Sequence, residues 1–146
     1  MTKSRRIDSA LAPPPVGAYP HARQHGNLLF LSGIGPRPPD GGAVPGVTLD
    51  AAGEVVDYDI DAQCHAVFAN VRAVLQSASA SWEDLLDVTV YLTDIKRDFL
   101  SFNRIWADYF RADGPSRTTV EVARLPTPIA IELKCIAAAP PAGSKK

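Results

Sequence analysis

The chain has 146 residues, of which 46% are hydrophobic and 21% charged, and its formal net charge is −1. This length predicts one domain, and the near-neutral charge argues against a nucleic-acid binder built on a basic face. No apolar run reaches the ~20 residues of a membrane helix, and no apolar region follows the basic N-terminus as in a secretory signal. The two cysteines, Cys64 and Cys135, fall on apolar positions, which predicts core residues in a protein of the reducing cytoplasm.

The first third of the chain is rich in proline and glycine. The polar and then proline-rich start predicts an extended arm over residues 1–12, because proline fixes φ and disfavours helix in the preceding residue. The apolar run 27–32 is closed by Gly33 and predicts a buried strand. Residues 35–53 predict either a long loop or a ragged hairpin, and loops of that length are often functional.

Periodic patterns dominate the rest of the chain. Helical spacing of apolar residues predicts a first helix over residues 59–78, with either Asp57 or Asp59 as its N-cap. A second helix with an aromatic stripe is expected over residues 98–111. Alternating side chains predict strands over residues 87–94, 117–125 and 129–138. The C-terminal residues 140–146 are expected to form a disordered tail.

This order of elements predicts an α+β fold in which two helices cover one face of a mixed β-sheet. The opposite face of the sheet then has no cover within the chain. A homo-oligomer whose copies pack on that face would supply one.

Several well-known motifs are incomplete in this chain. Gly33-Ile-Gly35 begins like a dinucleotide fingerprint, but Pro38 stands where the third glycine belongs. His21 and His25 have the i, i+4 spacing of a metal-binding pair, yet that spacing presents two ligands only on a helix, and proline and glycine bracket the pair. We therefore predict no metal site.

Two charged residues stand out on the last two predicted strands. Arg117 opens its strand directly after Gly114-Pro-Ser116, and Glu132 lies between Ile131 and Leu133. Glu132 either faces solvent on the open side of the sheet, or points into a pocket where it handles a proton or a water. Arg117 is either a surface charge or a clamp for a carboxylate, which its planar fork would hold in a bidentate manner.

The residues around these two charges carry a resemblance. Pro115-Ser-Arg-Thr-Thr-Val-Glu-Val-Ala-Arg-Leu-Pro126, followed by Ile131-Glu-Leu133, resembles the C-terminal signature of the Rid family, the YjgF-type reactive-intermediate deaminases. Gly17-Ala-Tyr-Pro-His21 resembles the N-terminal element of that family, and the resemblance spans about residues 8–138. It implies a single Rid-type domain over residues 1–146, a chorismate-mutase-like fold, and a homotrimer with active sites between subunits.

The resemblance also implies roles for individual residues. Arg117 would clamp the α-carboxylate of the substrate, and Glu132 would hold or activate the attacking water. The cleft would be lined by Tyr19, Ser32, Gly33 and Asn103. Many family members have cysteine where this chain has Thr119, so only backbone contacts are expected to carry over at that position.

Within the family, the amino-acid sequence of the chain most resembles the 2-aminomuconate deaminase branch. The segments that carry this likeness are Pro15–Arg23, the expanded loop 35–57 and Leu125–Glu132. The substrate of that branch is an enamine of a six-carbon dicarboxylate, so a second cation would be needed for the distal carboxylate. The candidates are Arg23, Arg37, His21 and His25.

The function that follows from the resemblance is hydrolytic deamination of 2-aminomuconate to 2-oxohex-3-enedioate and ammonia, with no cofactor. One alternative is the same chemistry on 2-iminopropanoate or 2-iminobutanoate. Another is a non-catalytic trimer whose clefts bind a small ligand. No nucleic acid and no membrane is expected as a partner.

Overall fold

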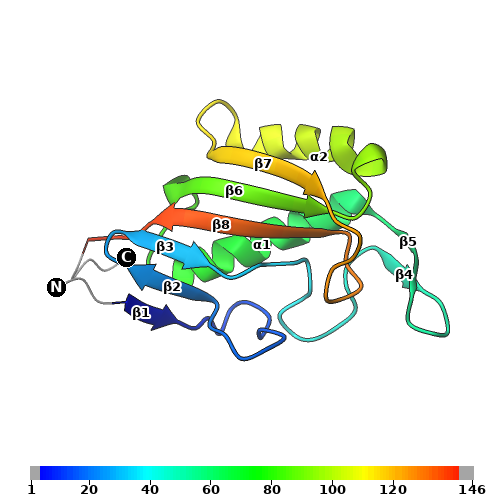
Figure 1. Cartoon of the computed structure of the whole chain (residues 1–146), viewed down its shortest axis with the longest axis horizontal. Coiled ribbons are helices and arrows are strands. Elements are labelled where there is room, and N and C mark those ends of the chain that lie inside the picture. The colour runs from blue at the N-terminus through cyan, green and yellow to red at the C-terminus, as the bar shows by residue number, and fades with distance from the viewer. Residues whose placement is uncertain (1–3, 142–146) are drawn as a thin grey trace.

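The structure is a computed structural model that describes residues 4–141. A six-stranded sheet runs in the order β1-β2-β3-β8-β6-β7, and a separate hairpin pairs β4 with β5 (Figure 1). The strands are β1 (Ser4–Ile7), β2 (Ala22–His25), β3 (Leu28–Leu31), β4 (Val47–Leu49), β5 (Val55–Tyr58), β6 (Leu85–Leu92), β7 (Ser116–Glu121) and β8 (Ile131–Ala138). The helices are α1 (Ile60–Ser77) and α2 (Ile95–Phe110), with a 3₁₀ turn at Trp82–Asp84.

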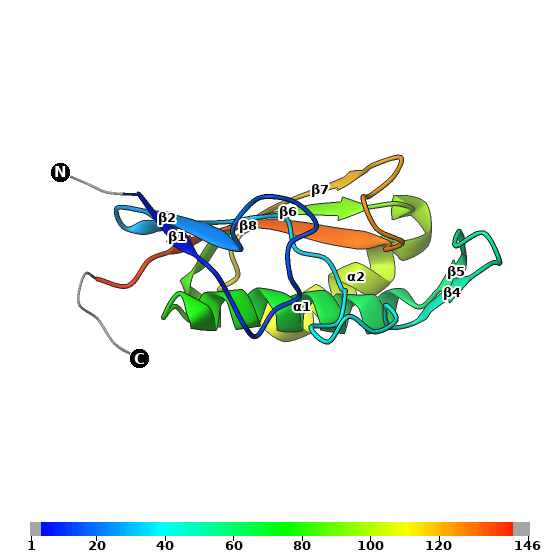
Figure 2. The ribbon, with the colours of Figure 1, turned by 90° about the horizontal axis from the view of Figure 1, so that it is seen from below.

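Both helices lie against the same face of the sheet, as Figure 2 shows, and the other face has no helix on it. Only β6 and β7 pair in parallel, whereas the other neighbouring strands of the sheet are antiparallel. The predicted α+β architecture, with two helices on one face of a mixed sheet, is therefore confirmed.

The helix α1 forms where its apolar periodicity predicts it. Asp59 is the N-cap, and its carboxylate accepts hydrogen bonds from the backbone N–H groups of Asp61 and Ala62. The apolar stripe is buried against the sheet and α2, and Phe68 packs edge-on against the ring of Tyr109 at a centroid distance of 4.5 Å.

The helix α2 begins three residues earlier than its sequence pattern indicates. Asp94 accepts a hydrogen bond from the backbone N–H of Arg97, so the N-cap lies at Asp94 and the helix starts at Ile95. It ends at Phe110, and the positive φ of 53° at the C-cap Arg111 stops the helix before Gly114.

The N-terminal segment, which we predicted to be an extended arm, contains the edge strand of the sheet. Residues of β1 pair in antiparallel register with β2, from Ser4 opposite His25 to Ile7 opposite Ala22. Neither strand has the apolar alternation that would reveal it in the sequence, because an edge hairpin buries little of its surface. Most of the predicted disordered tail, residues 142–146, lies outside the described residues.

The proline- and glycine-rich stretch 35–53 is a loop that leads into a hairpin, whose first strand β4 lies within the stretch and whose second strand β5 follows it. The hairpin is tied to the body of the protein by Tyr58, whose hydroxyl donates a 2.5 Å hydrogen bond to the buried carboxylate of Asp98. Burial raises the pKa of Asp98 and of Tyr58. This buried pair holds the base of the hairpin against α2.

Two further findings bear on the sequence predictions. Cys64 and Cys135 are fully buried core residues with free thiols, as predicted. Within residues 4–141, no helix combines the length and the apolar character that a membrane span requires.

Candidate active site

Glu132 is the second residue of β8 rather than a mid-strand residue, and it lies on the face of the sheet that the helices leave open. Its neighbours Ile131 and Leu133 are buried on the helix side, so strand alternation turns Glu132 the other way. The carboxylate is half-buried and makes no hydrogen bond or ion pair with any residue between 4 and 141. Burial raises the pKa of Glu132, and the positive charge of Arg37 opposes that rise.

Gly33 leaves the space that the carboxylate of Glu132 occupies. The segment after β3 is fixed beside β8 by two backbone hydrogen bonds between Ile34 and Leu133, of 2.9 and 2.8 Å. A Cβ atom on Gly33 would lie 2.2 Å from Oε1 of Glu132, well inside contact distance. Because its φ is not left-handed, glycine is needed here for room rather than for conformation.

A cavity of about 90 Å³ opens at this carboxylate, and we call it the Glu132 pocket. Four predicted site residues lie close together there: Tyr19, Gly33, Arg37 and Glu132. The remaining lining residues are Val16, Gly35, Pro126, Thr127 and Ile129. The structure therefore brings the N-terminal element, the segment after β3 and the start of β8 together around one pocket.

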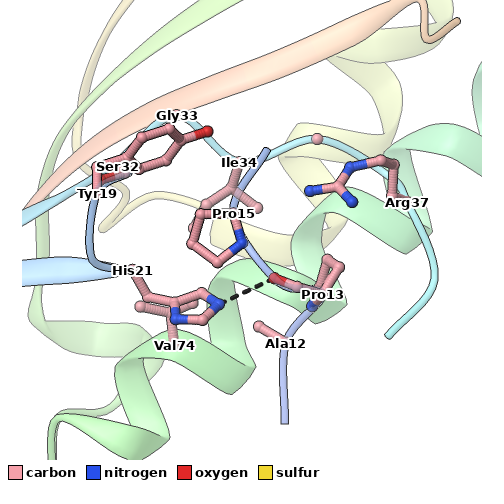
Figure 3. Close-up of a pocket in the computed structure, with 11 residues that line it drawn as sticks. Ala12, Pro13, Pro15, Tyr19, His21, Ser32, Gly33, Ile34, Arg37 and Val74 are labelled. Carbon is pink, nitrogen blue, oxygen red and sulfur yellow. Dashed lines mark hydrogen bonds between the residues drawn. The ribbon is translucent and has the colours of Figure 1, made fainter. Parts of the chain in front are cut away.

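A second, smaller cavity of about 30 Å³ adjoins the first through Tyr19, Gly33 and Arg37 (Figure 3). Ser32 lies on its wall and donates a 2.7 Å hydrogen bond from its hydroxyl to the carbonyl of Pro20. The hydroxyl proton of Ser32 is thus already used in a hydrogen bond to the backbone, but the hydroxyl oxygen can still accept a hydrogen bond from a ligand or water.

His21 also lines the smaller cavity, but both of its ring nitrogens are bonded to the backbone. Nδ1 accepts a hydrogen bond from the N–H of Ser9 at 3.0 Å, which requires that Nε2 donate to the carbonyl of Pro13 at 2.9 Å (Figure 3). His21 thus pins the N-terminal segment to the start of β2 and has no N–H to offer a ligand.

Arg117 lies elsewhere, on the edge strand β7, and together with the predicted Asn103 and two aromatic residues of α2 it forms a second group that we call the Arg117 cluster. Its Nη2 donates a 2.7 Å hydrogen bond to Oδ1 of Asn103 on α2. Its guanidinium also packs over the rings of Trp106 and Phe102, with centroid distances of 4.9 and 5.1 Å. The Arg117 cluster consists of these four residues. Burial lowers the pKa of Arg117, which is still a cation at neutral pH.

Thr119 follows Arg117 on the same face of β7. Its hydroxyl oxygen is buried and has no hydrogen-bond partner among residues 4–141. An orphaned hydroxyl beside an arginine that retains free N–H donors is a place where a ligand or water can bind.

The Arg117 cluster and the Glu132 pocket lie on opposite faces of the sheet. Val88 of β6 pairs with Arg117 on one side and with Cys135 on the other, so all three side chains point to the helix face. Tyr91 pairs with Glu132 and therefore shares the open face with it. One copy of the chain consequently does not bring Arg117 and Glu132 to one substrate.

Two other predicted candidates lie away from both groups. Arg23 points along the β1–β2 edge and donates a 2.9 Å hydrogen bond to the hydroxyl of Ser4, and His25 ends β2 at the exposed turn before β3. Neither lines the Glu132 pocket.

Among residues 4–141, no three His, Cys, Asp or Glu side chains converge in a way that could hold a metal ion.

Asn70 is a site residue that the sequence reasoning missed. It lies on α1, is nearly fully buried, and donates hydrogen bonds from Nδ2 to the carbonyls of Gly35 (2.8 Å) and Arg37 (2.7 Å). These bonds fix the loop that carries Arg37. The signal was present in the sequence, because an asparagine within the apolar stripe of a helix must find buried partners.

A family model described as Endoribonuclease L-PSP matches residues 9–139. The chain belongs to this family. Among its relatives is Reactive Intermediate Deaminase A, chloroplastic, of Arabidopsis thaliana, which is 33% identical over 135 residues and covers 92% of this chain and 66% of the relative. The Rid family that the sequence resembles is therefore confirmed.

Two further Rid-type proteins show how much of the chain the likeness covers. A RutC family protein of Pyrococcus abyssi is 39% identical over 126 residues, which are 86% of this chain and 90% of the relative. The crystal structure of TdcF from E. coli with bound serine has a TM-score of 0.78 at 29% identity, and the match covers 93% of this chain and 99% of TdcF. The family model, which matches residues 9–139, includes every element that builds the two groups of site residues.

Replacing Gly33 by alanine tests whether this Rid-type pocket depends on the missing Cβ. We expect the carboxylate of Glu132 to rotate away from its position beside Gly33, because it is the end of a flexible side chain and the backbone of Gly33 is not strained. A crystal structure of Gly33→Ala would show the displaced carboxylate. Urea unfolding would show a loss of less than about 1 kcal/mol. An undisturbed Glu132 would contradict this account of Gly33.

Proposed function

We propose that the chain is a hydrolytic enamine/imine deaminase whose active site forms between copies of the chain. The family includes a reactive intermediate deaminase, which supports deamination as the activity. The observation that carries the proposal is the separation of two incomplete groups of site residues. Among the described residues, Arg117 has a partly buried guanidinium without a carboxylate partner, and Glu132 has a half-buried carboxylate without a donor.

A ring of copies would bring these two groups together. The Arg117 cluster and the Glu132 pocket belong to different surfaces, so the contact between them is head-to-tail, and such contacts form a ring when the rotation from copy to copy closes. The open face of the sheet exposes Phe30 and Val120, each at 38%, which supports packing of a neighbouring copy there. We propose a homotrimer of single-domain chains, as the family resemblance implies.

The chemistry follows from the charges that each copy would contribute. The enamine first tautomerises to an imine, whose carbon next to the carboxylate is electrophilic. Arg117 of one copy holds that carboxylate, and Glu132 of the next copy accepts a proton from a water that attacks the imine carbon. Glu132 returns the proton to the nitrogen, and the resulting carbinolamine expels ammonia as its hydroxyl loses a proton and becomes the carbonyl of a 2-oxo acid. Imine and water thus give oxo acid and ammonia without a cofactor.

The other residues position these reactants. The raised pKa of Glu132 makes its carboxylate a stronger base than a solvated glutamate, and Gly33 keeps room for it. The residues that we propose to line the composite cleft are Tyr19, Ser32, Gly33 and Arg37 from one copy and Asn103 and Thr119 from the other. Because threonine stands at position 119, no thiol takes part there.

We propose 2-aminomuconate as the substrate, on the basis of the sequence likeness in Pro15–Arg23 and Leu125–Glu132. The principal alternative is the small imine 2-iminopropanoate or 2-iminobutanoate. Ammonia release measured side by side from 2-aminomuconate and from enzymatically generated 2-aminoacrylate distinguishes them. The free thiols Cys64 and Cys135 support a cytoplasmic location.

The matched family description names an endoribonuclease, and TdcF was crystallised with serine. We favour a small-molecule substrate, because a net charge of −1 gives no general attraction for a phosphate backbone. Salt-dependent cleavage of RNA without any release of ammonia would overturn the proposed deamination. Tight binding of a 2-oxo acid without turnover would instead indicate a binding protein.

Replacing Arg117 tests the carboxylate clamp. Arg117→Met keeps an unbranched apolar side chain over Trp106 but removes the charge, so we expect kcat/KM for ammonia release to fall roughly hundredfold or more while the oligomer stays folded. Arg104→Ala is the control, because Arg104 is exposed on α2 and its single side-chain contact within residues 4–141 is a long one of 3.4 Å with Asp61. Unchanged kcat/KM in Arg117→Met would refute the clamp.

The acidic limb of the pH profile tests Glu132 as the base. The active form is the carboxylate, so activity falls as the pH drops through the pKa of Glu132. Because burial raises that pKa, we expect the midpoint of the kcat/KM profile to lie above the ordinary glutamate value of about 4.3. Glu132→Gln should remove this limb together with most of the rate. A limb that persists in Glu132→Gln would show that another group titrates.

A further inference from the structure

Arg37 is the one cation among the four sequence candidates that lines the Glu132 pocket. His21 has both ring nitrogens bonded to the backbone, Arg23 is bonded to Ser4 at the sheet edge, and His25 lies at the exposed end of β2. The structure therefore separates candidates that the sequence left equivalent.

The guanidinium of Arg37 is held in place from two sides. The buried Asn70 fixes the carbonyls of Gly35 and Arg37, and Nη2 of Arg37 donates a 2.7 Å hydrogen bond to the carbonyl of Pro14. Figure 3 shows the side chain reaching from its loop toward the proline segment that lines the adjoining smaller cavity. The cation is thus built into the wall of the pocket rather than left free in solvent.

Most of the donors of Arg37 are still available. A guanidinium has five N–H groups, and Arg37 makes its only side-chain hydrogen bond within residues 4–141 to Pro14, without a salt bridge to any carboxylate there. Burial raises the pKa of Glu132 and the positive charge of Arg37 acts to lower it, but the two side chains form no ion pair. A half-buried arginine with free donors in a small pocket is suited to bind an anionic group of a ligand.

We infer that Arg37 binds a second carboxylate of the substrate and so selects dicarboxylate imines over monocarboxylate imines. This assignment rests on the proposed function, in which Arg117 of the neighbouring copy holds the α-carboxylate and Glu132 lies beside the reacting carbon. The remainder of the substrate then extends into the pocket that Arg37 lines. A monocarboxylate would leave this guanidinium without a partner.

Two stable 2-oxo acids of equal chain length isolate the distal carboxylate. 2-Oxoadipate carries it, whereas 2-oxohexanoate ends in a methyl group, and calorimetry gives both dissociation constants without any turnover. We expect the wild-type protein to bind 2-oxoadipate roughly ten- to hundredfold more tightly than 2-oxohexanoate. In Arg37→Met this ratio should fall close to one, and Arg37→Lys should keep part of it because the charge is retained.

The control is Arg5→Met, which removes an exposed arginine that contacts Gln24 on the β1–β2 edge. We expect it to keep the wild-type ratio. A wild-type ratio near one, or a preference that persists in Arg37→Met, would overturn the assignment. Ammonia release by the wild-type protein tests deamination separately, so a chain that deaminates without preferring the dicarboxylate loses only the role of Arg37.

Discussion

Side chains of strands that pair in register share one face of a sheet, and this rule determines where the charges of the site lie. The strand β6 pairs with β7 on one side and with β8 on the other, which turns Arg117 to the helix face and Glu132 to the open face. Changing the side of either residue would need a one-residue shift of register, which would also expose the apolar set of that strand. The hydrophobic core therefore keeps the two charges apart within one copy.

The surroundings of Asp98 indicate a structural role for its carboxylate, whereas those of Glu132 indicate a chemical role. Asp98 is fully buried, and it accepts a hydrogen bond from Tyr58 that secures the hairpin β4–β5. Glu132 is half-buried beside a cavity, and the residues between 4 and 141 give it no donor. A carboxylate that folding leaves without a partner is costly, and such a cost is common where a protein binds a ligand or moves a proton.

Much of this arrangement could be predicted from local patterns in the sequence. The helix α1 follows from its apolar stripe and its Asp59 cap, and the core position of Cys135 follows from strand alternation. The short strands β1 and β2 could not be predicted, because they bury little surface and carry no periodic signal. The placement of Arg117 and Glu132 on opposite faces of the sheet depends on the register between strands that are distant in the sequence. No local sequence pattern contains that register.

Activity of mixed oligomers tests the composite site most directly. Co-expression of Arg117→Met with Glu132→Gln in equal amounts gives rings in which some sites take the intact arginine from one copy and the intact glutamate from the next. If copies associate at random, about a quarter of the sites contain both residues, so we expect about a quarter of the wild-type rate of ammonia release. If both residues act within one copy, every site lacks one of them, and the mixture would be no more active than the separate variants.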